Sequence, residues 1–114
     1  MTPRIAIVDY EMGNRRSVEK ALERVGARTV ITRDPVELRA ADGLMLPGVG
    51  AFPAAMRILR DLELEETLRA CAASGQPFFG SCMGMQLLFD SSDEHGGAEG
   101  LGILRGAVRR LVHQ

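Results

Sequence analysis

The sequence predicts an α/β fold in which a mainly parallel β-sheet is doubly wound and sandwiched by helices. Short apolar runs alternate with segments whose apolar residues recur at helical spacing, as in chains of βαβ units. In addition, the motif Gly80-Ser81-Cys82-Met83-Gly84 follows an apolar run and precedes a helix-forming segment, which is the layout of a sharp strand-to-helix turn. The 114 residues suffice for one domain.

Four strands are predicted from runs of apolar or β-branched residues that are bounded by turn-forming residues. The first run ends in an acid, Asp9, and the third stops at Pro47. Continuous apolar runs of this length are typical of strands buried on both faces of a parallel sheet. The predicted strands, in chain order, are residues 5–9, 28–32, 43–46 and 78–79.

Helices are predicted between these strands from apolar residues spaced three and four apart. The helical segments are residues 18–25, one or two turns after Asp34-Pro35, residues 54–72 with a break near 61–62, and residues 85–89. Residues 101–104 and 107–112 are predicted as extended segments. Ligands bind beyond the carboxyl ends of parallel strands, so the candidate loops are residues 9–14, residues 47–52 and the turn at Cys82.

Composition argues against several classes of function. The net charge is −1 and the acidic and basic residues are well mixed, so no surface for nucleic acid or for a membrane is indicated. No apolar run approaches the length of a membrane-spanning helix or of a secretory leader. Two cysteines do not make a disulfide framework, and they lack metal-ligand spacing with the two histidines. We therefore expect a cytoplasmic protein that binds no metal and no cofactor.

Cys82 is the candidate catalytic residue. A free cysteine is more often an inert buried thiol, and we interpret Cys71 in this way because it lies on an apolar helix face. The glycines that flank Cys82 favour a nucleophile instead, since a strand-to-helix turn lifts its side chain into solvent at the edge of the sheet. The N–H groups at a helix N-terminus also favour the thiolate form of cysteine.

Two backbone N–H groups are candidates for an oxyanion hole. The segment Pro47-Gly48-Val49-Gly50 ends the third predicted strand, where a simple turn is the default interpretation. Beside a nucleophile, its N–H groups near Val49 could instead bind an oxyanion together with the N–H of Met83. Gln86 follows Cys82 by one turn, where it could contact a substrate or cap local backbone.

No general base is identified for Cys82. The predicted helix carries His95 about 15 Å along its axis from the thiol, whereas a base has to come within about 3 Å. His113 is the penultimate residue, where fraying is expected. Glu94 is interpreted as a solvated loop acid, and Asp9 as either a functional residue or a helix N-cap.

Three motifs, in order and spacing, resemble those of the glutaminase subunit of imidazole glycerol phosphate synthase, a class I glutamine amidotransferase of histidine biosynthesis. They are Asp9-Tyr10 with Gly13-Asn14 and Ser17-Val18, the segment from Leu46 to Phe52, and the segment from Gly80 to Phe89. The resemblance implies a flavodoxin-like amidotransferase fold of which residues 1–114 form the N-terminal part. The family's catalytic His-x-Glu motif has no counterpart here, so we expect a C-terminally truncated chain that alone hydrolyses little glutamine.

The resemblance also implies a role for each matching residue. Cys82 would attack the side-chain amide of glutamine, giving a γ-glutamyl thioester and ammonia, and water would then release glutamate. The remaining implied roles are the oxyanion hole at the N–H groups of Val49 and Met83, the glutamine pocket at Gly48, Gln86 and Glu94, and the partner interface at Asn14. The implied partner is a (β/α)8 barrel cyclase subunit, which receives the ammonia in a heterodimer.

The chain departs from the family pattern at several positions. Glycine is usual at Glu11 and a leucine-like residue at Arg15, and both positions belong to the loop that would face the partner. The changes at Ser81 and Met83 are mild, because the motif requires only its glycines and the cysteine. Two alternatives stay open: a non-catalytic flavodoxin-like interaction module, and another cysteine hydrolase of this fold that recruits His95 or His113.

Overall fold

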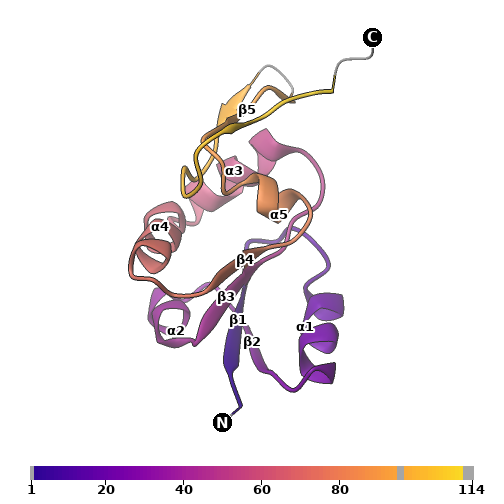
Figure 1. The fold of residues 1–114 in the computed structure, drawn as a ribbon, viewed down its shortest axis with the longest axis vertical. Helices are drawn as coiled ribbons and strands as arrows, with labels where there is room; N and C mark the ends of the chain where they lie inside the picture. Colours follow the sequence, from indigo (N-terminus) through magenta and orange to yellow (C-terminus); the bar gives the residue numbers. More distant parts are fainter. Residues whose placement is uncertain (1, 95–96, 112–114) are drawn as a thin grey trace.

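A four-stranded parallel sheet forms the centre of the molecule (Figure 1). The computed structural model describes residues 2–94 and 97–111. The strands are β1 (Arg4–Val8), β2 (Arg28–Thr32), β3 (Gly43–Leu46) and β4 (Phe78–Gly80). Their order is β2-β1-β3-β4, and every pairing is parallel. All four predicted strands are confirmed, and the predicted α/β class with them.

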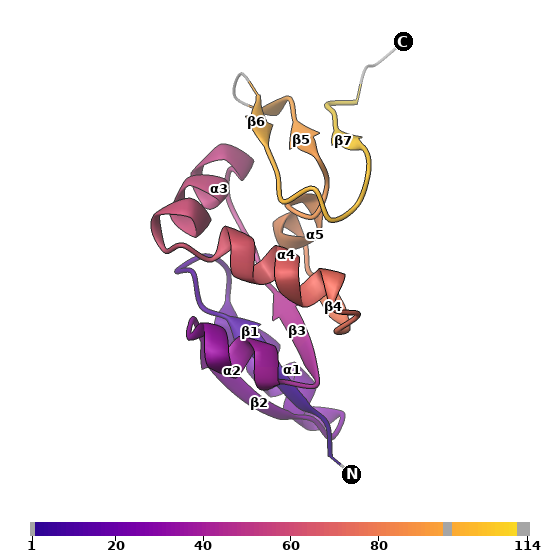
Figure 2. The same cartoon turned by 90° about the vertical axis from the view of Figure 1, so that its left-hand side faces the viewer.

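Helices flank this sheet on both faces (Figures 1 and 2). Helix α1 (Arg15–Arg24) lies on one side, and α2 (Pro35–Ala40) and α4 (Glu65–Ala73) lie on the other. Helix α3 (Phe52–Asp61) lies beyond the carboxyl ends of the strands. The predicted break near residues 61–62 is confirmed, since α3 ends at Asp61 and Glu63 has a left-handed φ of 58°. No helix in residues 2–94 and 97–111 is long and apolar enough to cross a membrane.

The helix that follows Cys82 is shorter than predicted. Helix α5 (Met83–Gln86) has four residues, whereas residues 85–89 were expected to continue as a helix. After Gln86 the helical pattern gives way to turns, because the N–H groups of Leu88 and Phe89 donate three residues back, to the carbonyls of Met85 and Gln86, at 3.2 Å. The carbonyls of Leu87 and Leu88 accept the N–H groups of Leu101 and Leu104 at 2.8 Å, so they are not available to a helix that would run on through residue 91.

A small second sheet follows α5, which the sequence did not indicate. Its strands are β5 (Ser91–Ser92), β6 (Ala98–Glu99) and β7 (Ala107–Val108), in the order β6-β5-β7. The prediction of an extended segment at residues 101–104 is wrong, since the chain bends there to bond with the end of α5. The extended segment predicted at 107–112 is a strand only over β7 within its described residues. Arg69 of α4 holds this region in place by donating to the carbonyl of Leu101 at 2.6 Å.

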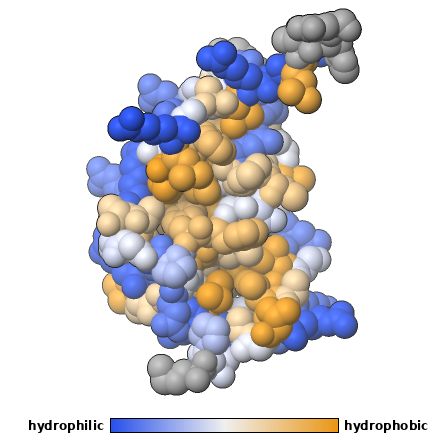
Figure 3. Space-filling model, viewed as in Figure 1, coloured by the Kyte–Doolittle hydropathy of each residue, from blue (hydrophilic) through white to orange (hydrophobic). Residues whose placement is uncertain are grey.

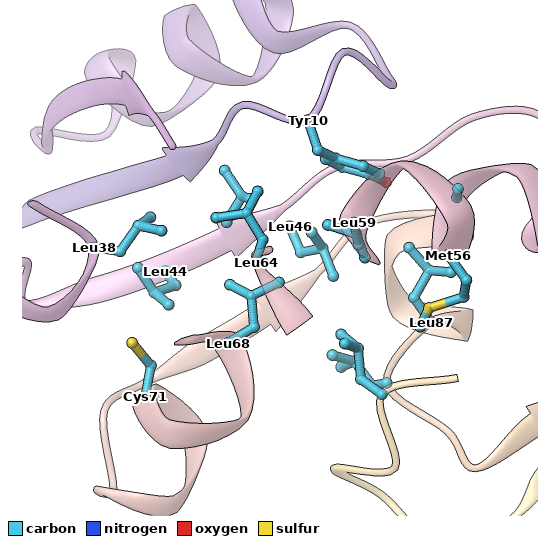
Figure 4. Close-up of a cluster of buried hydrophobic side chains, with 14 of the residues drawn as sticks. Tyr10, Leu38, Leu44, Leu46, Met56, Leu59, Leu64, Leu68, Cys71 and Leu87 are labelled. Carbon is cyan, nitrogen blue, oxygen red and sulfur yellow. The ribbon is translucent and has the colours of Figure 1, made fainter. Parts of the chain in front are cut away.

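The core lies between the sheet and helices α2, α3 and α4 (Figure 4). Leu44 and Leu46 of β3 pack there against leucines of the helices, such as Leu59 and Leu68. Cys71 is a member of this cluster and is 2% exposed, which confirms its interpretation as a core thiol. Burial raises the pKa of Cys71, and the nearby charge of Arg39 offsets only part of that effect. The thiol of Cys71 is therefore both inaccessible and protonated.

The opposite face of the sheet is only partly covered by α1. Beside it runs an apolar groove of about 470 Å³, lined by residues of β1, β3 and β4 and by Leu22 of α1. Phe79, on the edge strand of the described sheet, is 61% exposed at this groove. Figure 3, which looks onto the β4 edge of the sheet as Figure 1 does, shows hydrophobic residues gathered in the middle of that surface. This side of the described sheet thus presents apolar surface to solvent.

Candidate active site

The turn between β4 and α5 has the conformation of a nucleophile elbow. Cys82 is the N-cap of α5, is exposed, and has φ 54° and ψ −125°. This region of backbone space is strained for a residue with a Cβ, at a cost of about 1–3 kcal/mol. The N–H of Ser81 donates to the carbonyl of Leu46 at 3.0 Å, which ties the turn to the end of β3. The sequence-based prediction of a sharp strand-to-helix turn is confirmed.

Close backbone contacts explain why both flanking residues are glycines. A Cβ at Gly84 would overlap the carbonyl oxygen of Leu46 and lie 2.8 Å from its carbonyl carbon. A Cβ at Gly80 would lie 2.6 Å from the Cα of Met85. Since these neighbours are backbone atoms, they could move only with the strand or the helix. The elbow therefore packs directly on β3.

The loop after β3 lies against the elbow. Leu46 of β3 pairs with Gly80 of β4, so the two strands end side by side. A Cβ at Gly48 would lie 2.6 Å from the backbone nitrogen of Gly84, which shows how closely the loop and the elbow approach. Within the described part of the chain, the N–H groups of Val49 and Met83 donate to no acceptor. Neither group is occupied by an acceptor from the described residues, and their role as an oxyanion hole stays a prediction.

A buried tyrosine, which the sequence analysis did not single out, contacts the same loop. The hydroxyl of Tyr10 donates a hydrogen bond to the carbonyl of Pro47, and the side chain is fully buried. Burial raises the pKa of Tyr10 far above its ordinary value, so the hydroxyl keeps its proton and acts as a donor. Tyr10 follows β1 and Pro47 follows β3, and these two strands are neighbours in the sheet. This is the one signal in the sequence that could have suggested the contact.

Asp9 is the centre of an ion-pair cluster. Its carboxylate accepts a hydrogen bond from Arg15 and lies 3.5 Å from the guanidinium of Arg33. Burial alone would raise the pKa of Asp9, but Arg15, Arg33 and the N–H of Glu11 together bring the pKa below its ordinary value. Asp9 is not a helix cap; the side chain of Asn14 caps α1 instead, by accepting from the N–H of Ser17 at 3.1 Å.

This cluster predicts a pH-dependent contribution of Asp9 to stability. Asp9→Asn should lower the free energy of unfolding at neutral pH by about 1 kcal/mol. Because the folded pKa is depressed, the stabilisation is complete above the ordinary value of 3.8 and is lost as pH falls through the folded pKa. Urea unfolding of both proteins between neutral pH and about pH 2 checks this. A difference that persists undiminished at the acidic end would contradict it.

The other predicted site residues line two open pockets. Gln86 and Glu94 share a pocket of about 480 Å³ with Arg109, and Asn14 and Val49 share another of about 710 Å³. The carboxylate of Glu94 also accepts the N–H of Phe52 at 3.4 Å, so Glu94 contacts the start of α3 and is more than a solvated loop acid. The structure thus brings Gln86 and Glu94 together, whereas the side chains of Asn14 and Val49 lie at a different pocket.

The residues that the structure describes include no histidine that could act as the base for Cys82. His95 and His113, the histidines considered in the sequence analysis, lie outside the described residues. Among the residues that the structure describes, no three histidine, cysteine or acidic side chains gather as they would around a metal ion. The described site offers an exposed thiol at Cys82, the adjoining N–H of Met83 without a protein acceptor, and the loop after β3 packed against the elbow.

Comparison with known proteins gives consistent matches. The sequence profile of the SNO glutamine amidotransferase family matches residues 12–113. Relatives named imidazole glycerol phosphate synthase subunit HisH share 56% identity in Synechococcus elongatus, 50% in Trichormus variabilis and 50% in Bacillus cereus. These alignments cover 96%, 98% and 94% of this chain but 50%, 53% and 51% of the relatives. The chain thus spans about half the length of the curated relatives it matches.

Two solved structures share the fold. A glutamine amidotransferase crystal structure superposes with a TM-score of 0.78 at 24% identity, over 93% of this chain and 56% of that chain. A putative peptidase E from Listeria monocytogenes superposes with a TM-score of 0.72 at 13% identity, over 90% of this chain and 63% of that chain. At these identities the likeness concerns the fold alone.

Proposed function

The chain belongs to the SNO glutamine amidotransferase family, and from this premise we propose that it carries the nucleophile of the glutaminase subunit of imidazole glycerol phosphate synthase. In this role it acts in the cytoplasm, in histidine biosynthesis, and passes ammonia to a (β/α)8 barrel cyclase subunit in a heterodimer. The relatives that share 50–56% identity and bear the name of this subunit support the assignment. No cofactor is required for amide hydrolysis by a thiol.

The observation that carries the proposal is the strained, exposed conformation of Cys82 beside the Gly48 loop. A scaffold that only mediates an interaction gains nothing from a left-handed cysteine, whereas a nucleophile gains access to its substrate. This strain favours catalysis over the alternative of a non-catalytic module.

The proposed reaction uses the thiol of Cys82 and the backbone N–H groups of Val49 and Met83. The thiolate of Cys82 attacks the side-chain amide carbon of glutamine, and the carbonyl oxygen becomes an oxyanion that the N–H groups of Val49 and Met83 stabilise. The carbon–nitrogen bond then breaks, the nitrogen takes up the proton that the thiol released on ionisation and leaves as ammonia, and the γ-glutamyl thioester remains. Water adds to the thioester, and the carbon–sulfur bond breaks to give glutamate and the free thiol.

Substrate and partner contacts complete the proposal. Gln86 and Glu94, which share a pocket, would hold the amino-acid end of glutamine, and Gly48 would form the wall next to the thiol. Glu94 supplies a carboxylate that suits the ammonium group of glutamine. Asn14 is exposed at the start of α1 and would belong to the surface that meets the cyclase.

A comparison of two electrophiles tests the function. We define the labelling ratio as the rate constant of Cys82 with the chloromethyl ketone analogue of L-glutamine divided by that with iodoacetamide. Only the ketone forms an oxyanion during attack, so the ratio should exceed that of free cysteine by about 100-fold or more. L-glutamine should slow the ketone reaction, because it competes with the ketone for the same pocket. A ratio equal to that of free cysteine would overturn the proposed function.

A further inference from the structure

Tyr10 is the one residue of the described core whose polar group reaches the proposed oxyanion loop. Its ring extends from the end of β1 into the buried cluster (Figure 4), and its hydroxyl donates to the carbonyl of Pro47. A phenylalanine would fill the same apolar space. The hydroxyl therefore serves the hydrogen bond to Pro47, because a buried hydroxyl is stabilising only where it has a partner.

The loop that receives this hydrogen bond has few other restraints. Val49 lies between two glycines, and Gly50 has a left-handed φ of 97°. Glycines leave a backbone free to adopt several conformations, so the direction of the Val49 N–H depends on contacts with neighbouring elements. Contacts are provided by Gly13, where a Cβ would lie 3.0 Å from the nitrogen of Gly48, and by the hydroxyl of Tyr10.

The hydroxyl also lies where the loop meets the elbow. A Cβ at Gly48 would be 2.8 Å from the hydroxyl oxygen of Tyr10 and 2.6 Å from the backbone nitrogen of Gly84. Gly48 thus lies between the hydroxyl of Tyr10 and the backbone of Gly84 and is close to both. A change in how the Pro47 carbonyl is held alters the Pro47–Gly48 peptide plane, and this plane adjoins the peptide that carries the Val49 N–H.

We propose that Tyr10 is a positioning residue whose hydroxyl fixes the Pro47–Gly48 peptide, so that the N–H of Val49 is directed at the oxyanion formed on Cys82. This inference rests on the proposed function. Tyr10 does not touch the substrate; it acts through the loop. Asp9, the residue before Tyr10, is held by ion pairs with Arg15 and Arg33, and these restrain the backbone from which the tyrosine side chain extends.

Removal of the hydroxyl tests this role. Tyr10→Phe should lower the labelling ratio about tenfold, and only the rate constant with the ketone should change. The effect is smaller than the loss of a donor, because the N–H of Val49 is moved but not removed. The rate constant with iodoacetamide should stay the same, since that reaction forms no oxyanion. Gln76→Leu is the control: Gln76 donates to the carbonyls of Leu38 and Ala41 at 2.8 Å, at the opposite end of the sheet. It should destabilise the chain without changing the labelling ratio.

Tyr10 is the only tyrosine of the chain, which allows a second, gentler change. Biosynthetic replacement of tyrosine by 3-fluorotyrosine keeps the hydroxyl and alters only its acidity, and the labelling ratio should stay within about twofold. An unchanged ratio in Tyr10→Phe overturns the inference, as does an equal fall in Gln76→Leu. Loss of folding in Tyr10→Phe also overturns it, because the hydroxyl would then hold the core and not the loop. If the unsubstituted chain has a labelling ratio no higher than that of free cysteine, the proposed function is overturned, and the inference about Tyr10 is overturned with it.

Discussion

Replacing Cys82 with glycine should abolish reaction with the glutamine chloroketone and, at the same time, raise the free energy of unfolding by about 1 kcal/mol. The gain is expected because φ 54° and ψ −125° are strained for any residue with a Cβ but are open to glycine. Relief of this strain exceeds the loss that glycine causes by making the unfolded chain more flexible, which is about 0.5–1 kcal/mol. Urea unfolding and covalent labelling measure the two effects.

Cys82→Ala is the matched control for this substitution. Alanine also removes the thiol but keeps the Cβ, so labelling should disappear without the gain in stability. If the glycine and alanine variants unfold at the same urea concentration, the backbone at Cys82 holds no strain. The elbow would then be an ordinary turn, and the observation on which the proposed function depends would be lost.

Gly84→Ala is expected to have the largest effect on stability. Its Cβ would overlap the carbonyl oxygen of Leu46, and the substitution should lower the free energy of unfolding by about 3 kcal/mol or more. The elbow and β3 must separate to make room, and this moves the N–H of Met83 relative to the loop at Gly48. The labelling ratio of the fraction that remains folded should therefore also fall.

Gly43→Ala provides a control at a glycine of the same sheet. There, the nearest atom to a Cβ is the end of the Ile5 side chain, at 3.3 Å, and a side chain can rotate away. The loss in stability should stay below about 1 kcal/mol. Thermal unfolding and the labelling ratio of the two variants can be compared directly. Equal losses for Gly84→Ala and Gly43→Ala would show that backbone contact at the elbow is not what requires glycine.

The sequence was sufficient for features that depend on neighbouring residues. Apolar runs and helical spacing placed the strands and helices of the central sheet, and the glycines around Cys82 indicated the elbow. Asp34 was recognised as a boundary, and it caps α2 by accepting the N–H of Val36 at 2.9 Å. Each of these signals lies within a few residues of the structure that it predicts.

Features that depend on residues far apart in the chain were not predicted. The carbonyls of Leu87 and Leu88 bind the N–H groups of Leu101 and Leu104, and the restraint on the Pro47 carbonyl comes from Tyr10, 37 residues away. The ion pairs of Asp9 join it to Arg15, six residues away, and to Arg33, which lies beyond the next strand, and helical spacing indicates neither contact. Periodicity does not report which side chains meet across adjacent strand ends, so such contacts need the three-dimensional structure.

The most direct test of the account is to determine which cysteine the glutamine chloroketone modifies. The chain has two cysteines, exposed Cys82 and buried Cys71, so Cys71 serves as an internal control. After partial reaction and proteolysis, mass spectrometry should find the γ-glutamyl-like adduct on Cys82 alone, and an excess of L-glutamine should suppress it. Modification of both cysteines to similar extents, or modification of Cys82 that L-glutamine does not slow, would contradict a glutamine-directed nucleophile at the elbow.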